Sequence, residues 1–338
     1  MKVLYAIQSA GYISQVMGIV PALQQFAEVD ILLSGSQYNR TLPWNVKFRI
    51  KGLDFKTGIP KINNKIKLSY ISDTISSLAK DINTLPVDDY DIVFSDFEPV
   101  SAWACKRHNK SCIGLSHHHA LLNQKMPKLE GNEVSQYLFK HYAPVSQYYG
   151  FNFTATGNNI TTPIIRPEIR EAVPVKKGYY AVYLPSINDL HVIEMLARSK
   201  KVHWKVFSKN LKRPYSYQNI NVQPFSDEAF TKSLIESKGI ICDADFTISS
   251  EALFLGKKLC VVPANELYEQ QCNAAILDSM GVTVIDRLNE NSSDVLDNWL
   301  CDEKTVSVYY PDVTTGFIEK IFDEVNDSFD NKMLVSAG

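Results

Sequence analysis

The stretch Ala244-Asp-Phe-Thr-Ile-Ser-Ser-Glu-Ala-Leu-Phe-Leu-Gly-Lys-Lys-Leu-Cys-Val-Val-Pro263 decides the fold of the second half of this chain. A loop of small and hydroxyl side chains leads into a helical segment that carries Glu251, and an apolar strand follows. The polar segment Glu269-Gln270-Gln271-Cys272-Asn273-Ala274 then opens another helix. A helix N-terminus presents unpaired N–H groups and a partial positive charge, which favour a diphosphate. A carboxylate one turn inside the helix can accept both hydroxyls of a ribose, so this layout suits a nucleotide sugar.

The sequence on either side of this stretch alternates short apolar runs with longer periodic segments. Right-handed crossovers between such strands build a parallel sheet, so the pattern predicts an α/β fold. We expect strands at residues 3–7, 29–33, 92–94 and 111–115, and again at 179–184, 204–207, 220–222, 239–242 and 259–262. We expect helices at residues 15–26, 70–79, 100–107, 189–197 and 314–329. The chain looks irregular after residue 144, and the alternation restarts at residue 178.

The length of 338 residues exceeds what one hydrophobic core usually supports. We therefore expect two Rossmann-like domains, residues 1–160 and 170–338, with a hinge near residues 155–175. Ligands of such sheets lie outside the carboxyl ends of the strands. Five candidate site residues fall at those ends: Gly11, Asp96, Ser186, Phe225 and Glu251.

The run Ser249-Ser-Glu-Ala-Leu-Phe-Leu-Gly-Lys257, with Glu269-Gln270 and Asn273-Ala274, resembles the donor half of GT-B glycosyltransferases. The similarity is greatest to the branch around the peptidoglycan N-acetylglucosaminyltransferase and its archaeal and bacterial relatives. Ser95-Asp-Phe-Glu-Pro99 and the histidine-rich turn after Leu115 resemble the same relatives. The resemblance implies a GT-B fold, in which the parallel sheets of two Rossmann-like domains face each other across a cleft. It also implies a last helix that packs back on the N-terminal domain, and catalysis without a metal or other cofactor.

The resemblance implies a donor site on the second domain. Glu251 matches the ribose-binding carboxylate of the family; the competing interpretation is an ordinary first-turn glutamate stabilised by the helix dipole. Hydroxyl groups and backbone N–H groups at the same helix start would meet the diphosphate, although serine-rich helix starts are also common caps. The other candidate donor-binding residues are Gly11, Tyr12, Ser186, Phe225, Thr247, Ser249, Ser250, Glu269 and Gln270.

The general base is less clear, because Tyr12 stands where many relatives have a histidine after a glycine. A tyrosine hydroxyl with a pKa near 10 is a poor base at neutral pH. Asp96 and Glu98 are the first replacements to consider; helix capping is the structural alternative for Asp96 and the favoured interpretation of Glu98. His118 and His119, within three consecutive histidines of an expected loop, rank level with Asp96 because imidazole titrates near neutrality.

Two Asp-X-Asp triplets, at residues 89–91 and 243–245, have the spacing that binds a divalent cation in the other major glycosyltransferase fold. Both are better explained as ends or caps of elements, and we expect no required metal. Arg166 lies in the expected hinge, where it either offsets diphosphate charge or is an exposed linker residue.

Composition limits the classes of partner. The net charge of −2 and the lack of a basic, aromatic-rich face argue against nucleic acid. No apolar run reaches the roughly 18 residues of a membrane span, so peripheral contact is the most the sequence allows. The six cysteines form no CxxC pair, which favours reduced thiols in the cytoplasm. Residues that could touch a lipid-linked acceptor at an anionic surface are Lys61, Lys65, Lys67, Lys125, Lys128 and Tyr137.

The sequence supports three functions. The first is an inverting, metal-independent transferase that moves a hexose from a nucleotide sugar, expected to be a UDP-sugar, to a cell-envelope glycan or glycolipid. The second is a UDP-sugar 2-epimerase, which uses the same double-Rossmann architecture without an acceptor. The third is a non-catalytic nucleotide-sugar-binding protein, for which the missing first-turn histidine is the main support.

Overall fold

The computed structural model describes the backbone of residues 1–8, 13–35, 38–39, 41–52, 61–62, 65–66, 68–123 and 133–336. Side chains are described for these residues except 13–14, 61–62, 65–66, 68–75, 133–135, 138 and 328–336. The chain divides into two compact units. Among the described residues, unit 1 comprises residues 1–123, 133–164 and 311–336, and unit 2 comprises residues 165–310. Gly11, Tyr12, Lys67, Lys125 and Lys128 lie outside the described residues.

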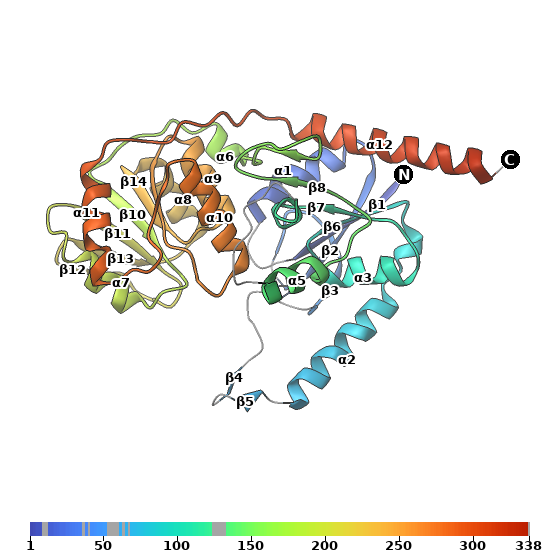
Figure 1. The fold of residues 1–338 in the computed structure, drawn as a ribbon, viewed down its shortest axis with the longest axis horizontal. Coiled ribbons are helices and arrows are strands. Elements are labelled where there is room, and N and C mark those ends of the chain that lie inside the picture. Colours follow the sequence, from blue (N-terminus) through green and yellow to red (C-terminus); the bar gives the residue numbers. More distant parts are fainter. Residues whose placement is uncertain are drawn as a thin grey trace. The chain divides into compact units, whose positions relative to one another are not determined.

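Unit 1 is built, in its described part, on a parallel sheet of seven strands in the order β3-β2-β1-β6-β7-β8-β9 (Figure 1). Its inner strands carry apolar runs because helices cover both faces of the sheet. The strands are β1 (Lys2–Gln8), β2 (Glu28–Ser34), β3 (Val46–Ile50), β6 (Ile92–Asp96), β7 (Cys112–Leu115), β8 (Gln147–Phe151) and β9 (Ile160–Thr161). The helices are α1 (Ile13–Leu23), α2 (Leu68–Thr84), α3 (Pro99–Arg107), α4 (His117–Ala120), α5 (Glu133–Tyr142) and α12 (Thr314–Ser336). A small hairpin, β4 (Lys61–Ile62) and β5 (Lys65–Ile66), and the 3-10 turn η1 (Val87–Asp89) complete the described elements.

Unit 2 repeats this plan, with the order β12-β13-β11-β10-β14-β15-β16. All its described pairings are parallel except that of β12 with β13. The strands are β10 (Tyr179–Tyr183), β11 (His203–Ser208), β12 (Tyr215–Tyr217), β13 (Ile220–Pro224), β14 (Gly239–Cys242), β15 (Lys258–Val261) and β16 (Thr283–Val284). The helices are α6 (Pro167–Arg170), α7 (Asp189–Leu196), α8 (Asp227–Glu236), α9 (Phe246–Phe254), α10 (Tyr268–Ser279) and α11 (Ser293–Cys301), with the 3-10 turn η2 (Glu290–Ser292).

Each sheet has one point where its strand order reverses direction. In unit 1 this switch point lies between β1 and β6, where Ile7 pairs with Asp96. In unit 2 it lies between β10 and β14, where Tyr183 pairs with Cys242. Doubly wound sheets bind ligands outside the carboxyl ends of the strands at this point. The predicted pair of Rossmann-like folds is confirmed.

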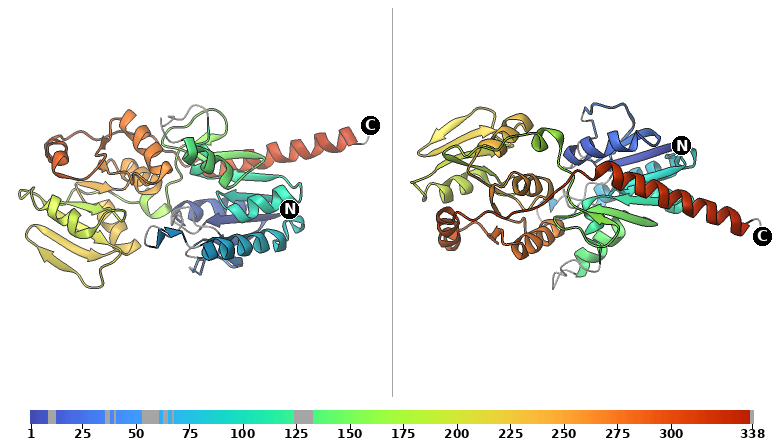
Figure 2. Two further views of the ribbon diagram at one scale, coloured as in Figure 1. Left: turned by 60° about the horizontal axis from the view of Figure 1, so that its bottom comes forward. Right: turned by 90° about the horizontal axis from the view of Figure 1, so that it is seen from above.

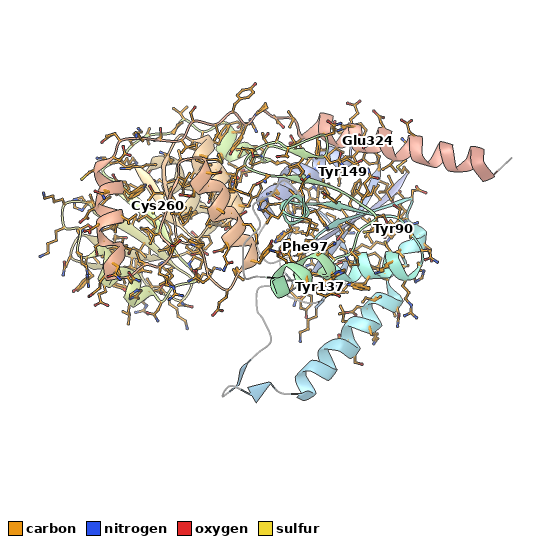
Figure 3. All side chains as sticks on the ribbon, viewed as in Figure 1. Tyr90, Phe97, Tyr137, Tyr149, Cys260 and Glu324 are labelled. Carbon is orange, nitrogen blue, oxygen red and sulfur yellow. The ribbon has the colours of Figure 1, made fainter. Side chains whose placement is uncertain are left out.

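The last helix, α12, packs against α1 within unit 1. The ring of Phe322 stacks on Phe26 at 5.4 Å between centroids and meets Phe94 edge-on at 6.0 Å. Glu324 of the same helix accepts a hydrogen bond from the Tyr149 hydroxyl of β8, and the two residues lie close together in Figure 3. The last turns of α12 extend past the sheet of this unit (Figure 2). Unit 2 therefore ends at residue 310, and the C-terminal helix belongs to the core of unit 1.

Three sequence-based expectations need correction. The segment after residue 144 is not irregular, because it forms β8 and β9 at the edge of the first sheet. His117, His118 and His119 do not lie in an extended loop; they form the short helix α4 and are buried. Strand β3 was not predicted, because its half-exposed residues give no apolar run.

Candidate functional site

The switch point of unit 2 gathers polar side chains from three elements. The Ser186 hydroxyl, just after β10, donates a 2.9 Å hydrogen bond to the Asp243 carboxylate, just after β14. The Gln270 side chain of α10 also bonds this carboxylate. Burial raises the pKa of Asp243 to about 6, and the bonds from Ser186 and Gln270 oppose the rise. The buried carboxylate of Asp243 therefore connects the ends of β10 and β14, the two strands on either side of the switch point.

The N-terminus of α9 already has an anionic partner. Asp245 is its N-cap, and its carboxylate oxygen accepts hydrogen bonds from the amides of Thr247 (3.0 Å) and Ile248 (3.1 Å). In this structure these two N–H groups are therefore engaged within the protein. Two hydroxyls of the same helix, those of Thr247 and Ser250, are buried and lack a hydrogen-bond partner in the described part of the chain.

Glu251 lies on α9 with only 2% of its side chain exposed. It forms a two-pronged ion pair with Arg166, with Nε to Oε1 at 2.7 Å and Nη2 to Oε2 at 2.9 Å. Arg166 Nη2 also donates to the Thr231 hydroxyl of α8 at 3.0 Å. Burial raises the pKa of Glu251 to about 7, although Arg166 pulls it down. The interpretation of Arg166 as an exposed linker residue is therefore wrong, because its side chain is 20% exposed and paired with Glu251.

Aromatic rings line the neighbouring strand ends. Phe225, after β13, stacks on Tyr183 at the end of β10, with ring centroids 4.3 Å apart and planes inclined by 17°. The Phe225 amide donates to the Ser208 carbonyl at 2.8 Å, so this backbone donor is engaged. Lys209 Nζ lies 5.8 Å from the centre of the Tyr183 ring and supplies a cation at this edge of the sheet. Phe225 is half-buried and lies at the carboxyl ends of the strands rather than in the hydrophobic core.

The start of α10 is buried against the same edge. Glu269 and Gln270 are each 6% exposed, and the Gln270 amide oxygen accepts a 2.8 Å bond from the Ala264 amide. Asn273 donates to the Ala244 carbonyl at 2.9 Å and ties α10 to the loop before α9. Ser249 is fully buried, with its hydroxyl 4.0 Å from the Cys242 sulfur. The donor-site candidates of unit 2 are therefore brought together at one sheet edge, with Ser249 in the core behind it.

The switch point of unit 1 holds Asp96, the last residue of β6, at 5% exposure. Capping of α3 falls to Glu98, whose carboxylate accepts from the amides of Val100 (2.9 Å) and Ser101 (2.6 Å). The structural alternative for Asp96, a helix cap, is therefore wrong. Between them Phe97 has φ of +51°, a left-handed backbone that is strained for a residue with a Cβ.

The three histidines of α4 have different surroundings. His118, 8% exposed, stacks on Phe97 with 4.6 Å between ring centroids and planes inclined by 7°. His119 is fully buried, and its Nδ1 lies 2.8 Å from the Ser116 hydroxyl. Burial, with His118 nearby, lowers the pKa of His119 to about 3, so His119 is a much weaker base than free imidazole. His117 Nδ1 lies 2.8 Å from the Phe151 carbonyl. The geometry leaves Asp96 and His118 as the better base candidates.

Neither Asp-X-Asp triplet forms a metal site within the described residues, where we find no group of three potential ligands. Asp91 accepts a bond from the Lys2 amide, and Asp245 caps α9, as the sequence interpretation of caps and ends predicts.

Comparison with known proteins assigns the family. The model of the family described as "Glycosyl transferase family 1" matches residues 1–302. The chain belongs to glycosyl transferase family 1. None of the curated proteins compared with it matches in sequence.

Solved structures show that this glycosyltransferase has the GT-B fold. MurG of Acinetobacter baumannii is 15% identical, with a TM-score of 0.57 over 95% of this chain and 99% of that one. UGT89C1 of Arabidopsis thaliana, solved with UDP, is 13% identical, with a TM-score of 0.57 over 96% of this chain and 94% of that one. A UDP-N-acetylglucosamine 2-epimerase is 13% identical, with a TM-score of 0.56 over 98% of this chain and 97% of that one. At these identities the likenesses show the fold alone.

Sequence reasoning missed two features of this candidate site. The pairing of Arg166 with Glu251 joins residues 85 positions apart, and no local pattern signals it. The buried bond between Ser186 and Asp243 follows only from the strand order, which places β10 beside β14.

Proposed function

We propose that this glycosyltransferase transfers a hexose from a nucleotide sugar, expected to be a UDP-sugar, to a glycan or glycolipid of the cell envelope. The observation that carries the proposal is the buried Glu251 carboxylate on α9, the helix that follows the switch-point strand β14. A fixed carboxylate there suits the two hydroxyls of a ribose, and the aromatic rings at the neighbouring strand ends suit a base.

The remaining donor contacts follow from this placement. In our proposal the Tyr183–Phe225 pair lies against the base, and the Ser186 hydroxyl and Lys209 face the diphosphate. Glu269 and Gln270 face the transferred sugar. The unpartnered hydroxyls of Thr247 and Ser250 support a polar ligand near the start of α9, because buried hydroxyls without partners are rare and costly.

The reaction is proposed to invert the anomeric carbon. A base takes the proton of the acceptor hydroxyl while its oxygen attacks that carbon, and the nucleoside diphosphate leaves with the bonding electrons. Asp96 and His118, at the switch point of unit 1, are the proposed candidates for this base. The proposed chemistry requires no metal ion, because the hydroxyls near the start of α9 and Lys209 would stabilise the leaving group.

The acceptor and the compartment are also proposals. Tyr137 of α5 is 64% exposed, which supports a role at an acceptor surface. We find no helix, among the described residues, that is long and apolar enough to cross a bilayer. Six free cysteines, five of them buried, support a cytoplasmic location, with peripheral contact at the inner face of the membrane.

A transfer assay tests the proposal. The protein is incubated with labelled UDP-, GDP-, dTDP- and ADP-sugars, with and without an extract of envelope glycolipids. A transferase releases nucleotide and labels the glycolipid only when both are present, and NMR of the product gives its anomeric configuration. An epimerase converts UDP-N-acetylglucosamine without an extract. A binding protein shows a rise in melting temperature with one nucleotide but no turnover.

A further inference from the structure

Arg166 forms the most strongly directed contacts of the candidate donor site. It precedes α6 as its N-cap residue, and its guanidinium bridges two helices, contacting Glu251 of α9 and Thr231 of α8. Its side chain is 20% exposed, whereas that of Glu251 is 2% exposed. Two parallel N–H···O bonds fix both the position and the plane of the carboxylate, which a single contact does not.

Arg166 also decides the charge of Glu251. Burial disfavours the ionised carboxylate, and two further acidic residues, Asp245 and Glu168, disfavour it as well. Among the described charged groups that act on Glu251, Arg166 alone favours the ionised form. Without that guanidinium the carboxyl group would hold its proton at neutral pH, and one of its oxygens would become a donor.

The ion pair leaves Glu251 able to bind a ligand. Each carboxylate oxygen receives one N–H from Arg166 and keeps a further lone pair that can accept a hydroxyl. Adjacent hydroxyls of a ribose supply two such donors. The guanidinium nitrogens Nε and Nη2 donate to Glu251 and Thr231, so these two nitrogens contact protein side chains.

We propose that Arg166 is a positioning residue for the ribose of the donor: it fixes the position and plane of the Glu251 carboxyl group, favours its ionised form as the acceptor of the ribose hydroxyls, and does not itself bind the phosphates. This inference rests on the proposed function, because it requires a ribonucleotide donor. It assigns a shared role to a linker residue and a helix residue that are far apart in sequence.

The test compares the binding of UDP with that of its 2′-deoxy form. Dissociation constants are measured by calorimetry for UDP and 2′-deoxy-UDP on the full chain and on Arg166→Gln, Arg166→Lys and Glu251→Gln. The full chain should bind UDP about tenfold to a hundredfold more tightly than 2′-deoxy-UDP, as a hydrogen bond to a charged group predicts. Arg166→Gln and Glu251→Gln should bind both ligands weakly and equally. Arg166→Lys keeps the charge and should retain part of the preference.

A matched control comes from another Arg–Glu pair of unit 2. Arg198 contacts Glu290 at 2.6 Å on the surface, so Arg198→Gln should leave both dissociation constants unchanged. Melting temperatures of all variants establish that they are folded. If Arg166→Gln does not fold, Glu251→Gln and Arg166→Lys carry the test.

Three results overturn the inference. If Arg166→Gln, or Arg166→Lys in its place, raises the dissociation constants of UDP and 2′-deoxy-UDP by the same factor, Arg166 contacts the phosphates or acts only on the stability of the fold. If the full chain binds UDP without preferring it to the deoxy form, Glu251 does not read the ribose, although the proposed donor class stands. If the full chain binds none of UDP, GDP, ADP and CDP, the proposed donor class fails and this inference fails with it.

Discussion

The side chain of Glu251 is ionisable, buried and held by the guanidinium of Arg166. Its carboxyl group has a pKa of about 7 in the folded protein, against an ordinary value of 4.5. Burial of the ionised carboxylate lowers the stability of the fold at high pH. Buried ionisable groups of this kind occur mostly at functional sites. The pair therefore links the stability of unit 2 to its proposed chemistry.

This pKa predicts a pH dependence of stability. Between pH 4.5 and about 7 the folded state holds more protons on Glu251 than the unfolded state does. The free energy of unfolding should therefore fall as pH rises through this window, by on the order of 3 kcal/mol, and change little above it. Urea unfolding at pH 5, 6, 7 and 8 measures this fall against Glu251→Gln, which should keep only the smaller fall that the raised pKa of Asp243 contributes. Parallel pH profiles for the two proteins would contradict the assigned pKa.

The base candidates give a prediction about turnover. Asp96→Asn or His118→Gln should lower kcat by roughly a hundredfold to ten-thousandfold, because no general base then accepts the proton of the acceptor hydroxyl. Nucleotide affinity should stay within about twofold in both variants, because in our proposal the donor binds unit 2. His108→Gln, which changes a partly exposed histidine paired with Asp88, is the control. If both variants keep wild-type kcat, neither residue is the base.

Helix α9 combines a cap and a proposed ligand site in its first turn. Asp245 satisfies two amides that the sequence suggested for a diphosphate. The same carboxylate lies near Asp243, so the start of the helix carries two acidic groups. The residue types predicted the helix and its cap, but only the structure shows that the cap takes the donors an anion would use.

Replacement of this cap by asparagine separates the two roles. Asp245→Asn keeps an N-cap of equal quality while it removes a negative charge, so stability should change by less than about 0.5 kcal/mol. Affinity for a nucleoside diphosphate should rise by about twofold to fivefold, as a charge at a helix N-terminus predicts. Asp294→Asn in the first turn of α11 should leave affinity unchanged. A loss of affinity in Asp245→Asn would mean that the carboxylate contributes to binding.

Helix α4 fits against its sheet because two glycines make room for it. A Cβ on Gly114 would lie 2.8 Å from three atoms of the His119 ring, and one on Gly150 would lie 2.7 Å from the Ser116 carbonyl oxygen. The three histidines suggested a polar loop, since their type is usually half-exposed. Their burial follows from these long-range contacts with β7 and β8, which the local sequence does not reveal.

Gly114→Ala should therefore destabilise unit 1 by about 1–3 kcal/mol, as overpacking of a filled core does. The matched control is Gly316→Ala in α12, where a Cβ meets nothing within 4 Å. Alanine there should stabilise the helix slightly. Urea midpoints of both variants measure the difference, and equal midpoints would show that α4 adjusts without cost.

The described chain forms two units whose sheets share the order of six parallel strands and differ at one outer strand each, β9 in unit 1 and the antiparallel β12 in unit 2. The sequence predicted most inner strands correctly, because strands buried on both faces read as apolar runs, as β1 and β14 do. It missed β3, whose residues are half-exposed, and β8, whose Gln147 and two tyrosines give a weak pattern. The candidate residues were found through the strand ends, whereas their partners, such as Arg166 for Glu251, depend on tertiary contacts.

In our proposal the switch point of unit 2 binds the ribose of a nucleotide donor through Glu251. A crystal structure of the full chain with the nucleoside diphosphate that raises its melting temperature most would test this directly. We predict both ribose hydroxyls within hydrogen-bond distance of the Glu251 carboxylate, with Arg166 still paired to it. A nucleotide bound elsewhere, or a ribose whose hydroxyls face other residues while Glu251 contacts only Arg166, would contradict the account.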